Sequence, residues 1–278
     1  GIQEESRSIW VPAFAGMTQE GALEEIRRVV SPVPIGMERQ TAVFRIFRHD
    51  PSVEGEDPRF QEYEVPVRQG LTVLDALFHI QEKLDSSLAF RASCRAAACG
   101  SCAMHIAGRY GLACQTQVGP LADGPIVLRP LAHLPIIRDL VVDMAPFWEK
   151  YNKIRPFLVP GEPAPEKERT QSPDDRDKLE GLIDCILCGI CSSACVVGGT
   201  DGAYLGPAAL LNANRFFQDT RDGAAEERLR IVDGEHGVWR CHTIFSCQEA
   251  CPKGLDPTGA IMTLRRTIIR HRWKKLVR

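Results

Sequence analysis

The feature that most constrains this chain is a run of four closely spaced cysteines in its second half. Cys185, Cys188, Cys191 and Cys195 follow the pattern C-x2-C-x2-C-x3-C. Runs with this spacing hold iron–sulfur clusters through thiolates, and the fourth cysteine binds a different cluster from the first three. The pattern therefore predicts a second cysteine run elsewhere in the chain, whose residues complete both clusters.

Residues 241–252 provide the second run, on the same grid of positions, but Ile244 stands where the middle cysteine would fall. Crossing the fourth cysteines between the runs yields one group of four thiolates and one group of three. An iron corner without a thiolate is the corner most easily lost, so the group of three predicts a [3Fe–4S] cluster. The predicted ligands are Cys185, Cys188, Cys191 and Cys251 for a [4Fe–4S] cluster, and Cys195, Cys241 and Cys247 for the [3Fe–4S] cluster.

Another cysteine group lies in the first half of the chain. Cys94, Cys99, Cys102 and Cys114 have the C-x4-C-x2-C spacing with a later fourth cysteine that is typical of plant-type [2Fe–2S] sites. The three groups together use all eleven cysteines. Zinc is the alternative metal for cysteines at such spacings, but zinc sites pair their cysteines two by two rather than as triplets with a remote fourth.

The residues around Cys94, Cys99, Cys102 and Cys114 predict a β-grasp fold. Residues 43–48 and 62–67 alternate in the manner of half-buried strands. Thr72 and Asp75 form a capping-box pattern at the start of a helix. The apolar stripe of that helix is Leu74, Leu77, Phe78 and Leu84, and the closing strands are predicted at residues 111–116 and 126–128.

These patterns predict an α+β chain of two domains with an extension. Residues 1–38 are predicted to be a peripheral or disordered extension. Residues 39–138 are predicted to form an N-terminal β-grasp plant-type [2Fe–2S] ferredoxin domain. A mainly α-helical, bacterial-ferredoxin-like domain is predicted at residues 139–278, starting with a helix at 139–151.

Charge and hydropathy exclude several classes of protein. The net charge of −2 argues against a nucleic-acid partner, and no stretch of 18 apolar residues predicts a membrane-spanning helix. The odd number of cysteines and their tight spacing favour a reducing compartment. Residues 261–278 hold seven Lys or Arg and no acid, which leaves −9 for the rest. That segment is either a solvated helix face or a surface facing a membrane edge or a partner.

No machinery for bond chemistry is visible in the sequence. There is no G-x-G-x-x-G fingerprint and no nucleophile–base constellation. His79 and His105 fall within predicted elements and are interpreted as structural, whereas His242 directly follows Cys241. Three one-electron centres without substrate chemistry predict an electron-transfer chain that connects a two-electron cofactor to an acceptor.

The chain resembles the iron–sulfur subunit of the succinate dehydrogenase and fumarate reductase (complex II) family over roughly residues 40–270. The resemblance implies a respiratory oxidoreductase linked to the tricarboxylic acid cycle. The matching motifs are Ser93-Cys94-Arg95, Cys99-Gly100-Ser101-Cys102-Ala103-Met104, Asp184-Cys185-Ile186-Leu187-Cys188, Leu205-Gly206-Pro207-Ala208, Arg240-Cys241-His242-Thr243-Ile244 and Cys251-Pro252-Lys253-Gly254-Leu255.

By this resemblance, electrons pass between FAD on a flavoprotein subunit and a quinone held against hydrophobic membrane-anchor subunits. The chain is then expected to lie peripherally on a membrane. The expected side is the cytoplasmic face of a bacterial inner membrane, or the matrix side in a mitochondrion. His242 and Ile244 match residues that line the quinone pocket in the family, and Arg240 matches a basic residue beside the three-iron cluster.

Three departures from the family pattern stand out. Arg95 is followed by two alanines where the family has Glu-Gly, and Val196 replaces a proline after Cys195. Residues 196–201 lack the tryptophan pair of the ubiquinone-linked enzymes and are closer to the fumarate reductase branch. Menaquinone therefore stays open as the acceptor.

The alternative function is that of an iron–sulfur subunit of another quinone-linked or heterodisulfide-type dehydrogenase. Such subunits lack a plant-type domain at the front or carry two complete cysteine runs. The cysteines from Cys94 to Cys114 and the residue Ile244 both count against this alternative.

Overall fold

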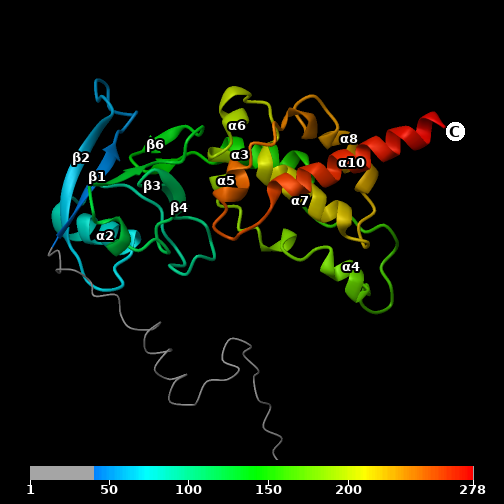
Figure 1. Ribbon diagram of the computed structural model, residues 1–278, viewed down its shortest axis with the longest axis horizontal. Coiled ribbons are helices and arrows are strands. Elements are labelled where there is room, and N and C mark those ends of the chain that lie inside the picture. The colour runs from blue at the N-terminus through cyan, green and yellow to red at the C-terminus, as the bar shows by residue number, and fades with distance from the viewer. Residues whose placement is uncertain (1–40, 278) are drawn as a thin grey trace, which may run out of the picture. The chain divides into compact units, whose positions relative to one another are not determined.

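A five-stranded sheet forms the first part of the computed structural model, which describes residues 41–277 (Figure 1). Its strands are β1 (Thr41–Arg48), β2 (Arg59–Pro66), β3 (Ala103–Ile106), β4 (Arg109–Leu112) and β5 (Ile126–Arg129). The strand order is β2-β1-β5-β3-β4, and β1 runs parallel to β5 while the other neighbours are antiparallel. This mixed sheet is the predicted β-grasp.

The strands form where the side chains alternate between core and solvent. In β1, Phe44 and Ile46 are completely buried while Arg45 between them is exposed. The β3–β4 hairpin turns at Ala107 and Gly108, both in the left-handed region, as a tight two-residue hairpin requires. The prediction of a strand at residues 111–116 was wrong in its bounds. The chain turns out of the sheet after Leu112, whose carbonyl accepts the N–H groups of the turn that follows.

Helix α2 (Val73–His79) packs against the sheet with the predicted capping box. The Thr72 hydroxyl accepts from the Asp75 N–H at 3.1 Å, and the Asp75 carboxylate accepts from the Thr72 N–H at 3.1 Å. The helix continues into a π-helical turn at Ile80–Leu84. Leu84 was predicted in the apolar stripe, and this was wrong: the wider turn rotates it outward, and it is 51% exposed.

The helix predicted at residues 139–151 starts later than expected. A short hairpin of β6 (Ile136–Arg138) and β7 (Val141–Val142) comes first, with Asp139 in the left-handed region between them. Helix α3 (Ala145–Lys153) then begins with a proline in its first turn. Its buried side chains are Phe147 and Tyr151, and the hairpin takes up the first part of the predicted range.

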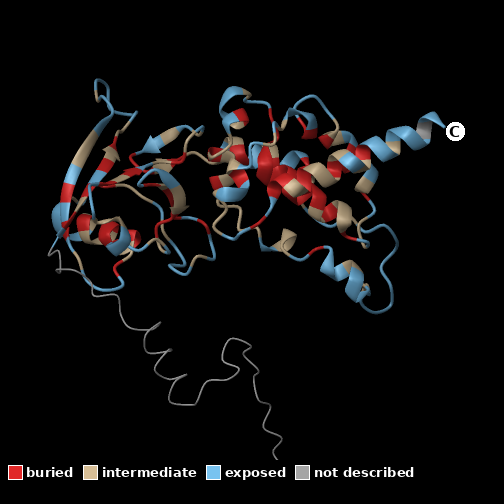
Figure 2. Ribbon diagram, in the orientation of Figure 1, coloured by how far each residue is buried: buried red, intermediate tan, exposed pale blue. Residues whose placement is uncertain are grey.

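Helices make up the second half of the molecule, with short 3-10 turns at Leu182–Asp184 and Val238–Arg240. A further 3-10 turn, Gly119–Leu121, lies in the sheet half between β4 and β5. The helices are α4 (Pro173–Asp177), α5 (Ile190–Ser193), α6 (Val196–Thr200), α7 (Gly206–Gln218), α8 (Ala225–Val232), α9 (Ser246–Glu249) and α10 (Pro257–Leu276). Most residues of α7 are buried, and α10 packs beside it (Figure 2). The helical core is therefore built around α7.

The two halves share buried contacts. Ile190 of α5 is completely buried within the core of the sheet half, and Ile186 and Cys188 pack against that core. Residues Gln40–Arg278 accordingly form one compact unit. The boundary between 39–138 and 139–278 stays a prediction, and the predicted extension at 1–38 lies outside the described residues. Among residues 41–277, no helix has the length and apolar character needed to cross a membrane.

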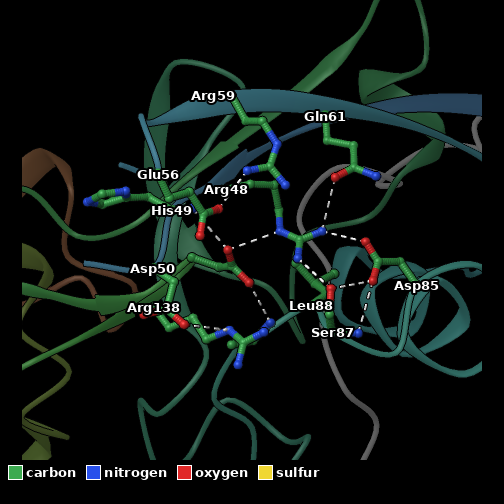
Figure 3. A network of polar contacts seen from close by, with 12 residues as sticks. Arg48, His49, Asp50, Glu56, Arg59, Gln61, Asp85, Ser87, Leu88 and Arg138 are labelled. Carbon is green, nitrogen blue, oxygen red and sulfur yellow. Dashed lines mark hydrogen bonds and ion pairs between the residues drawn. The ribbon is translucent and has the colours of Figure 1, made fainter. Parts of the chain in front are cut away.

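A buried arginine joins the end of β1 to two distant segments (Figure 3). The Arg48 guanidinium donates to Asp139 at 3.0 Å, to Asp85 at 2.5 Å and to Ser87 at 2.8 Å. Asp139 also accepts the backbone N–H groups of His49 at 3.1 Å and Ala89 at 2.9 Å. Because Asp139 is only 2% exposed, this network replaces the water that both charges lose on folding.

The pKa values in this network follow the ion pairs. Burial opposes ionisation, but hydrogen bonds with Ser87, Tyr63 and Arg48 hold the pKa of the Asp85 carboxyl well below its usual range. Burial and the hydrogen bond to Asp85 raise the pKa of Tyr63 to about 12. Asp85 therefore stays charged and Tyr63 stays neutral at neutral pH.

We predict that Asp139→Ala destabilises the chain by roughly 3 kcal/mol, because it removes one of the two carboxylates paired with the buried Arg48 and leaves two backbone N–H groups without an acceptor. The control is Glu56→Ala, which removes an exposed pair with Arg59 and is expected to cost less than about 1 kcal/mol. Chemical denaturation of both variants measures the difference. Equal losses of stability would contradict the role assigned to Asp139.

Candidate metal centres

The first cysteine group, which consists of Cys94, Cys99, Cys102 and Cys114, comes from a loop that precedes β3 and from the turn that follows β4. Five backbone N–H groups point at its sulfur atoms, and Cys102 is buried while Cys94 and Cys99 are exposed. The N–H donors, with their distances to sulfur, are Cys94 to Cys99 at 3.5 Å, Ala96, Ala98 and Cys99 to Cys94 at 3.4, 3.3 and 3.3 Å, and Ala97 to Cys114 at 3.4 Å. Such donors stabilise negative charge on sulfur.

The same loop curls through residues with left-handed backbone. Arg95 and Ala97 have φ of 55° and 53°, and Gly100 has φ of 73°. For an L-residue this region costs about 1–2 kcal/mol. Position 97 is glycine in the family pattern, so the departure noted in the sequence falls where glycine is conformationally favoured. The alanine keeps the backbone course that aims its N–H at Cys114.

The thiols of this group have different pKa values. Hydrogen bonds from Ser101 and from backbone N–H groups lower the pKa of Cys99 to about 6. Burial raises the pKa of Cys102 to about 11. The site is therefore preorganised for a thiolate at its exposed end, whereas metal binding must displace the proton of the buried thiol.

The second cysteine group lines an apolar cavity with about 410 Å³ of empty space. Cys185, Cys188, Cys191 and Cys251 all contribute to its wall, among apolar side chains from Ile186 to Leu255. Burial raises the pKa of Cys188 to about 11 and that of Cys191 well above its usual value. The Asn212 amide from α7 counteracts burial at Cys185. Partly buried thiols around an apolar cavity fit a cluster bound by thiolates.

The third cysteine group lines a second cavity with about 340 Å³ of empty space. Cys195, Cys241 and Cys247 are joined there by His242 and Ile244, so the structure brings these five predicted residues together. The Cys247 sulfur lies 3.4 Å from the Thr258 hydroxyl, and the Thr243 N–H donates to Cys241 at 3.4 Å.

The two cysteine runs of the helical half have the same local backbone conformation. Leu187 and Thr243 stand two residues after Cys185 and Cys241, and both are left-handed. Gly189 and Phe245 stand four residues after these cysteines, are also left-handed, and precede the short helices α5 and α9. The runs are therefore repeated units, and Ile244 occupies the place of Cys188.

The fold groups the cysteines in the way that the predicted crossing of ligands requires. Cys251 from the second run lies with the first three cysteines of the first run. Cys195 from the first run lies with Cys241 and Cys247. Helices α5 and α9 are in contact, which places each run's fourth cysteine beside the other run.

Arg240 is placed differently from the other two residues predicted near a quinone. Its guanidinium donates to Asp201 at 2.8 Å, and Asp201 also lies 3.0 Å from the His236 ring. Hydrogen bonding with His236 is the main cause that lowers the pKa of Asp201 to about 2. Arg240 thus holds the turn after α6 and does not line the third cavity.

The loops of the first two groups touch each other. A methyl group built on Gly100 would meet the Cys188 Cβ at 2.7 Å and its Cα at 2.9 Å. Only a residue without a side chain permits this approach. The structure thus places a loop of the first cysteine group directly against a cysteine of the second.

Within residues 41–277, no three His, Cys, Asp or Glu side chains converge closely enough to hold one metal ion. A multi-iron cluster distributes its thiolates over several iron atoms, with at most two on one iron, so three of them do not converge on a single ion as the ligands of zinc do. The donor set, the N–H groups aimed at sulfur and the cavities lined by thiols fit clusters.

Comparison with known proteins agrees with this geometry. Residues 43–149 match the model of a 2Fe-2S iron-sulfur cluster binding domain, and residues 181–255 match that of a 4Fe-4S dicluster domain. The fold and the sites define a two-domain iron–sulfur protein of the electron-transfer class.

Two curated relatives specify the family. The succinate dehydrogenase iron-sulfur subunit of Paracoccus denitrificans is 43% identical over 81% of this chain and 87% of its own length. The mitochondrial succinate dehydrogenase [ubiquinone] iron-sulfur subunit 1 of Oryza sativa subsp. japonica is 44% identical over 81% and 82%. A chain of the Mycobacterium smegmatis Sdh1 complex in the apo form superposes with a TM-score of 0.77 at 26% identity, covering 84% of this chain and 97% of that chain. The chain belongs to the succinate dehydrogenase iron–sulfur subunit family.

Several residues that shape the sites were missed by sequence reasoning. Tyr204 and Thr258 lie beside the third group, and Asn212 lies beside the second. All three come from segments outside the cysteine runs, so no spacing rule connects them to a cluster. The only available signal was the position of Tyr204 immediately before the motif at residues 205–208.

We predict that Gly100→Ala destabilises the chain by about 1–3 kcal/mol more than Gly108→Ala. Both glycines are left-handed, but a methyl group on Gly108 meets no atom within 4 Å, so only Gly100→Ala must separate the two loops. Thermal denaturation measures stability, and EPR relaxation measures the magnetic interaction between the first two centres. Identical behaviour of the two variants would show that the close approach is not needed.

Proposed function

We propose that this chain relays electrons between FAD on a flavoprotein subunit and a membrane quinone within a succinate dehydrogenase. In this proposal the sheet half holds a [2Fe–2S] cluster, and the helical half holds a [4Fe–4S] and a [3Fe–4S] cluster. The ligands are Cys94, Cys99, Cys102 and Cys114 for [2Fe–2S], Cys185, Cys188, Cys191 and Cys251 for [4Fe–4S], and Cys195, Cys241 and Cys247 for [3Fe–4S].

The observation that supports this assignment most directly is the exchange of cysteines between the two runs. Cys195 is four residues from Cys191 in sequence, yet it lines a different cavity together with residues almost fifty positions away. This exchange is the ligand pattern of paired clusters. It also accounts for why the third cavity has only three thiols, because Ile244 stands at the fourth position.

Iron–sulfur clusters, when bound, supply one-electron redox chemistry over a wide range of potentials. The chain's own residues hold the thiolates, exclude water and direct donors at sulfur. At the first site these donors are backbone N–H groups, whereas Thr258 and the Thr243 N–H serve at the third. The contact between Gly100 and Cys188 keeps the first two sites close, as rapid electron transfer requires.

The surroundings of the third cavity support quinone binding there. Val196, Ile244 and Phe245 line the cavity and are all about half exposed or more. Large apolar side chains left in contact with solvent mark sites for apolar partners. His242 at the same cavity is the proposed polar contact to the quinone, and Arg240 braces the adjacent turn through Asp201.

The end of α10 supports contact with hydrophobic membrane-anchor subunits or the membrane edge. Trp273, Leu276 and Val277 are between 68% and 82% exposed, and the basic residues on either side of Trp273, Arg272 and Lys274, are exposed as well. The end of α10 is accordingly drawn as exposed in Figure 2. A basic segment with exposed apolar groups suits an anionic membrane surface. We place the chain peripherally on the membrane, on the cytoplasmic face or its matrix equivalent.

An iron–sulfur subunit of another dehydrogenase is less well supported. Identity of 43% over 81% of the chain ties it to succinate dehydrogenase subunits. A match to a 2Fe-2S domain in front of the dicluster domain also differs from the pattern expected of heterodisulfide-type subunits. A zinc scaffold is disfavoured by the cysteine spacing, because zinc sites pair their cysteines two by two rather than as triplets with a remote fourth.

We predict that succinate reduces the [2Fe–2S] and [3Fe–4S] centres in membranes that contain the intact complex. Low-temperature EPR is expected to show a reduced [2Fe–2S] signal and a loss of the oxidised [3Fe–4S] signal after succinate is added. Membranes from a strain without this chain are the control. Silent spectra at an iron content near zero would contradict cluster binding, and signals that ignore succinate would contradict the proposed donor.

We predict that Ile244→Cys converts much of the third centre to a [4Fe–4S] cluster, because it supplies a thiolate at the vacant position of the grid. The control is Val196→Cys, which adds a thiol to the same cavity away from that position. Iron analysis and EPR of the purified complex measure the conversion. An unchanged [3Fe–4S] signal in iron-replete Ile244→Cys protein would refute the prediction.

A further inference from the structure

Tyr204 is a buried tyrosine whose hydroxyl has no hydrogen-bond partner among the residues that the structure describes. The side chain is completely buried in the helical core, just before α7. Backbone hydrogen bonds at this point, from Tyr204 to Asp201 and from Leu205 to His236, hold the residue in place. A buried hydroxyl without a partner destabilises the fold, so its presence calls for an acceptor.

The acceptor candidates are the sulfur atoms of the third group. Tyr204 lines the cavity that Cys195, Cys241 and Cys247 also line. A tyrosine hydroxyl carries its proton at neutral pH, so it can serve as a hydrogen-bond donor to one of these sulfur atoms. Thr258, the other buried hydroxyl at this cavity, already contacts the Cys247 sulfur.

We propose that the Tyr204 hydroxyl donates a hydrogen bond to a sulfur atom at the site of Cys195, Cys241 and Cys247 when that site is loaded, and thereby raises its reduction potential. The physical reason is charge. The reduced centre carries one more negative charge than the oxidised centre, so a fixed donor stabilises the reduced form more. Tyr204 is therefore a tuning residue and not a ligand. This inference rests on the proposed function.

The first and third sites differ in how they supply such donors. The first site uses a ring of backbone N–H groups, which no side-chain substitution removes. Besides the Thr243 N–H, the third site uses the hydroxyl of Thr258 and, in our proposal, that of Tyr204, both in a buried setting. Low local dielectric strengthens each of these bonds. A higher potential at the third site suits its place as the last centre before the acceptor.

The test is Tyr204→Phe in the intact membrane complex, with EPR-monitored redox titration of all three centres. The hydrogen bond to a charged acceptor predicts a change of about tenfold in the reduction equilibrium of the third centre, toward the oxidised form. Tenfold corresponds to about 59 mV for one electron. The midpoints of the other two centres are expected to stay unchanged and serve as internal controls.

Two further variants bracket this result. Tyr110→Phe removes a tyrosine hydroxyl in the sheet half that bonds the Ala132 backbone, and it is expected to leave the third centre unchanged. Thr258→Val removes the hydroxyl that contacts Cys247, and it is expected to lower the same potential as Tyr204→Phe. Because Tyr204→Phe deletes an atom without a protein partner, we expect assembly of the complex to be retained.

The outcomes separate this inference from the proposed function. A wild-type complex without a [3Fe–4S] signal would refute both. A normal wild-type signal with the same midpoint in Tyr204→Phe would refute the inference alone. Loss of the third signal in Tyr204→Phe, or equal shifts of all three midpoints, would indicate a structural role and would also overturn it. A selective downward shift supports it.

Discussion

Thiols from distant parts of the chain have to meet at common cavities, and this requirement organises the helical half. Two cysteine runs with the same left-handed positions face each other through α5 and α9, and each run gives its last cysteine to the other run's cavity. The contact between the runs must form before either cavity has its full set of thiols. Helices α7 and α10 pack behind these cavities, so the core and the sites are built from the same residues. Metal binding and folding are coupled in such an arrangement.

The junction between the halves depends on a second close approach. Gly100 from the first cysteine loop lies against Cys188, and Ile190 reaches the core of the sheet half. The two contacts act in the same direction, because one brings the loops together and the other keeps them in place. A chain that carries electrons between buried sites needs such short separations more than it needs a flexible linker. The same residues thus serve both packing and the proposed transfer.

Buried arginines stabilise the loops that surround these sites. Arg48 connects the end of β1 to Asp139 and Asp85, and Arg228 of α8 donates to the backbone carbonyls of Ile154 and Phe157 as well as to Asp222. In both cases one planar guanidinium satisfies several acceptors that belong to irregular segments. The cores are small for the amount of loop they carry, and these networks supply order where regular secondary structure is absent.

The sequence by itself determined the sets of cysteines, the vacant position at Ile244, the β-grasp order of strand, strand, helix and cysteine loop, and the family. Spacing is sufficient for these features because a thiolate grid of two or three residues leaves few alternative ligand sets, and because strand alternation and the capping box at Thr72 are local patterns. The details that failed were non-local. A π-helical turn moved Leu84 outward, and the pairing of β6 with β7 delayed the start of α3 until Ala145.

Only the tertiary structure decided which uncharged groups stand around the thiols and how near the sites are to one another. The contact of Gly100 with Cys188, the pairing of Arg240 with Asp201 and the burial of the Tyr204 hydroxyl each join segments that are far apart in the chain. Short-range sequence rules do not extend over such separations. The number and type of ligands are a property of local spacing, whereas their environment is a property of packing, and the environment is what adjusts a redox potential.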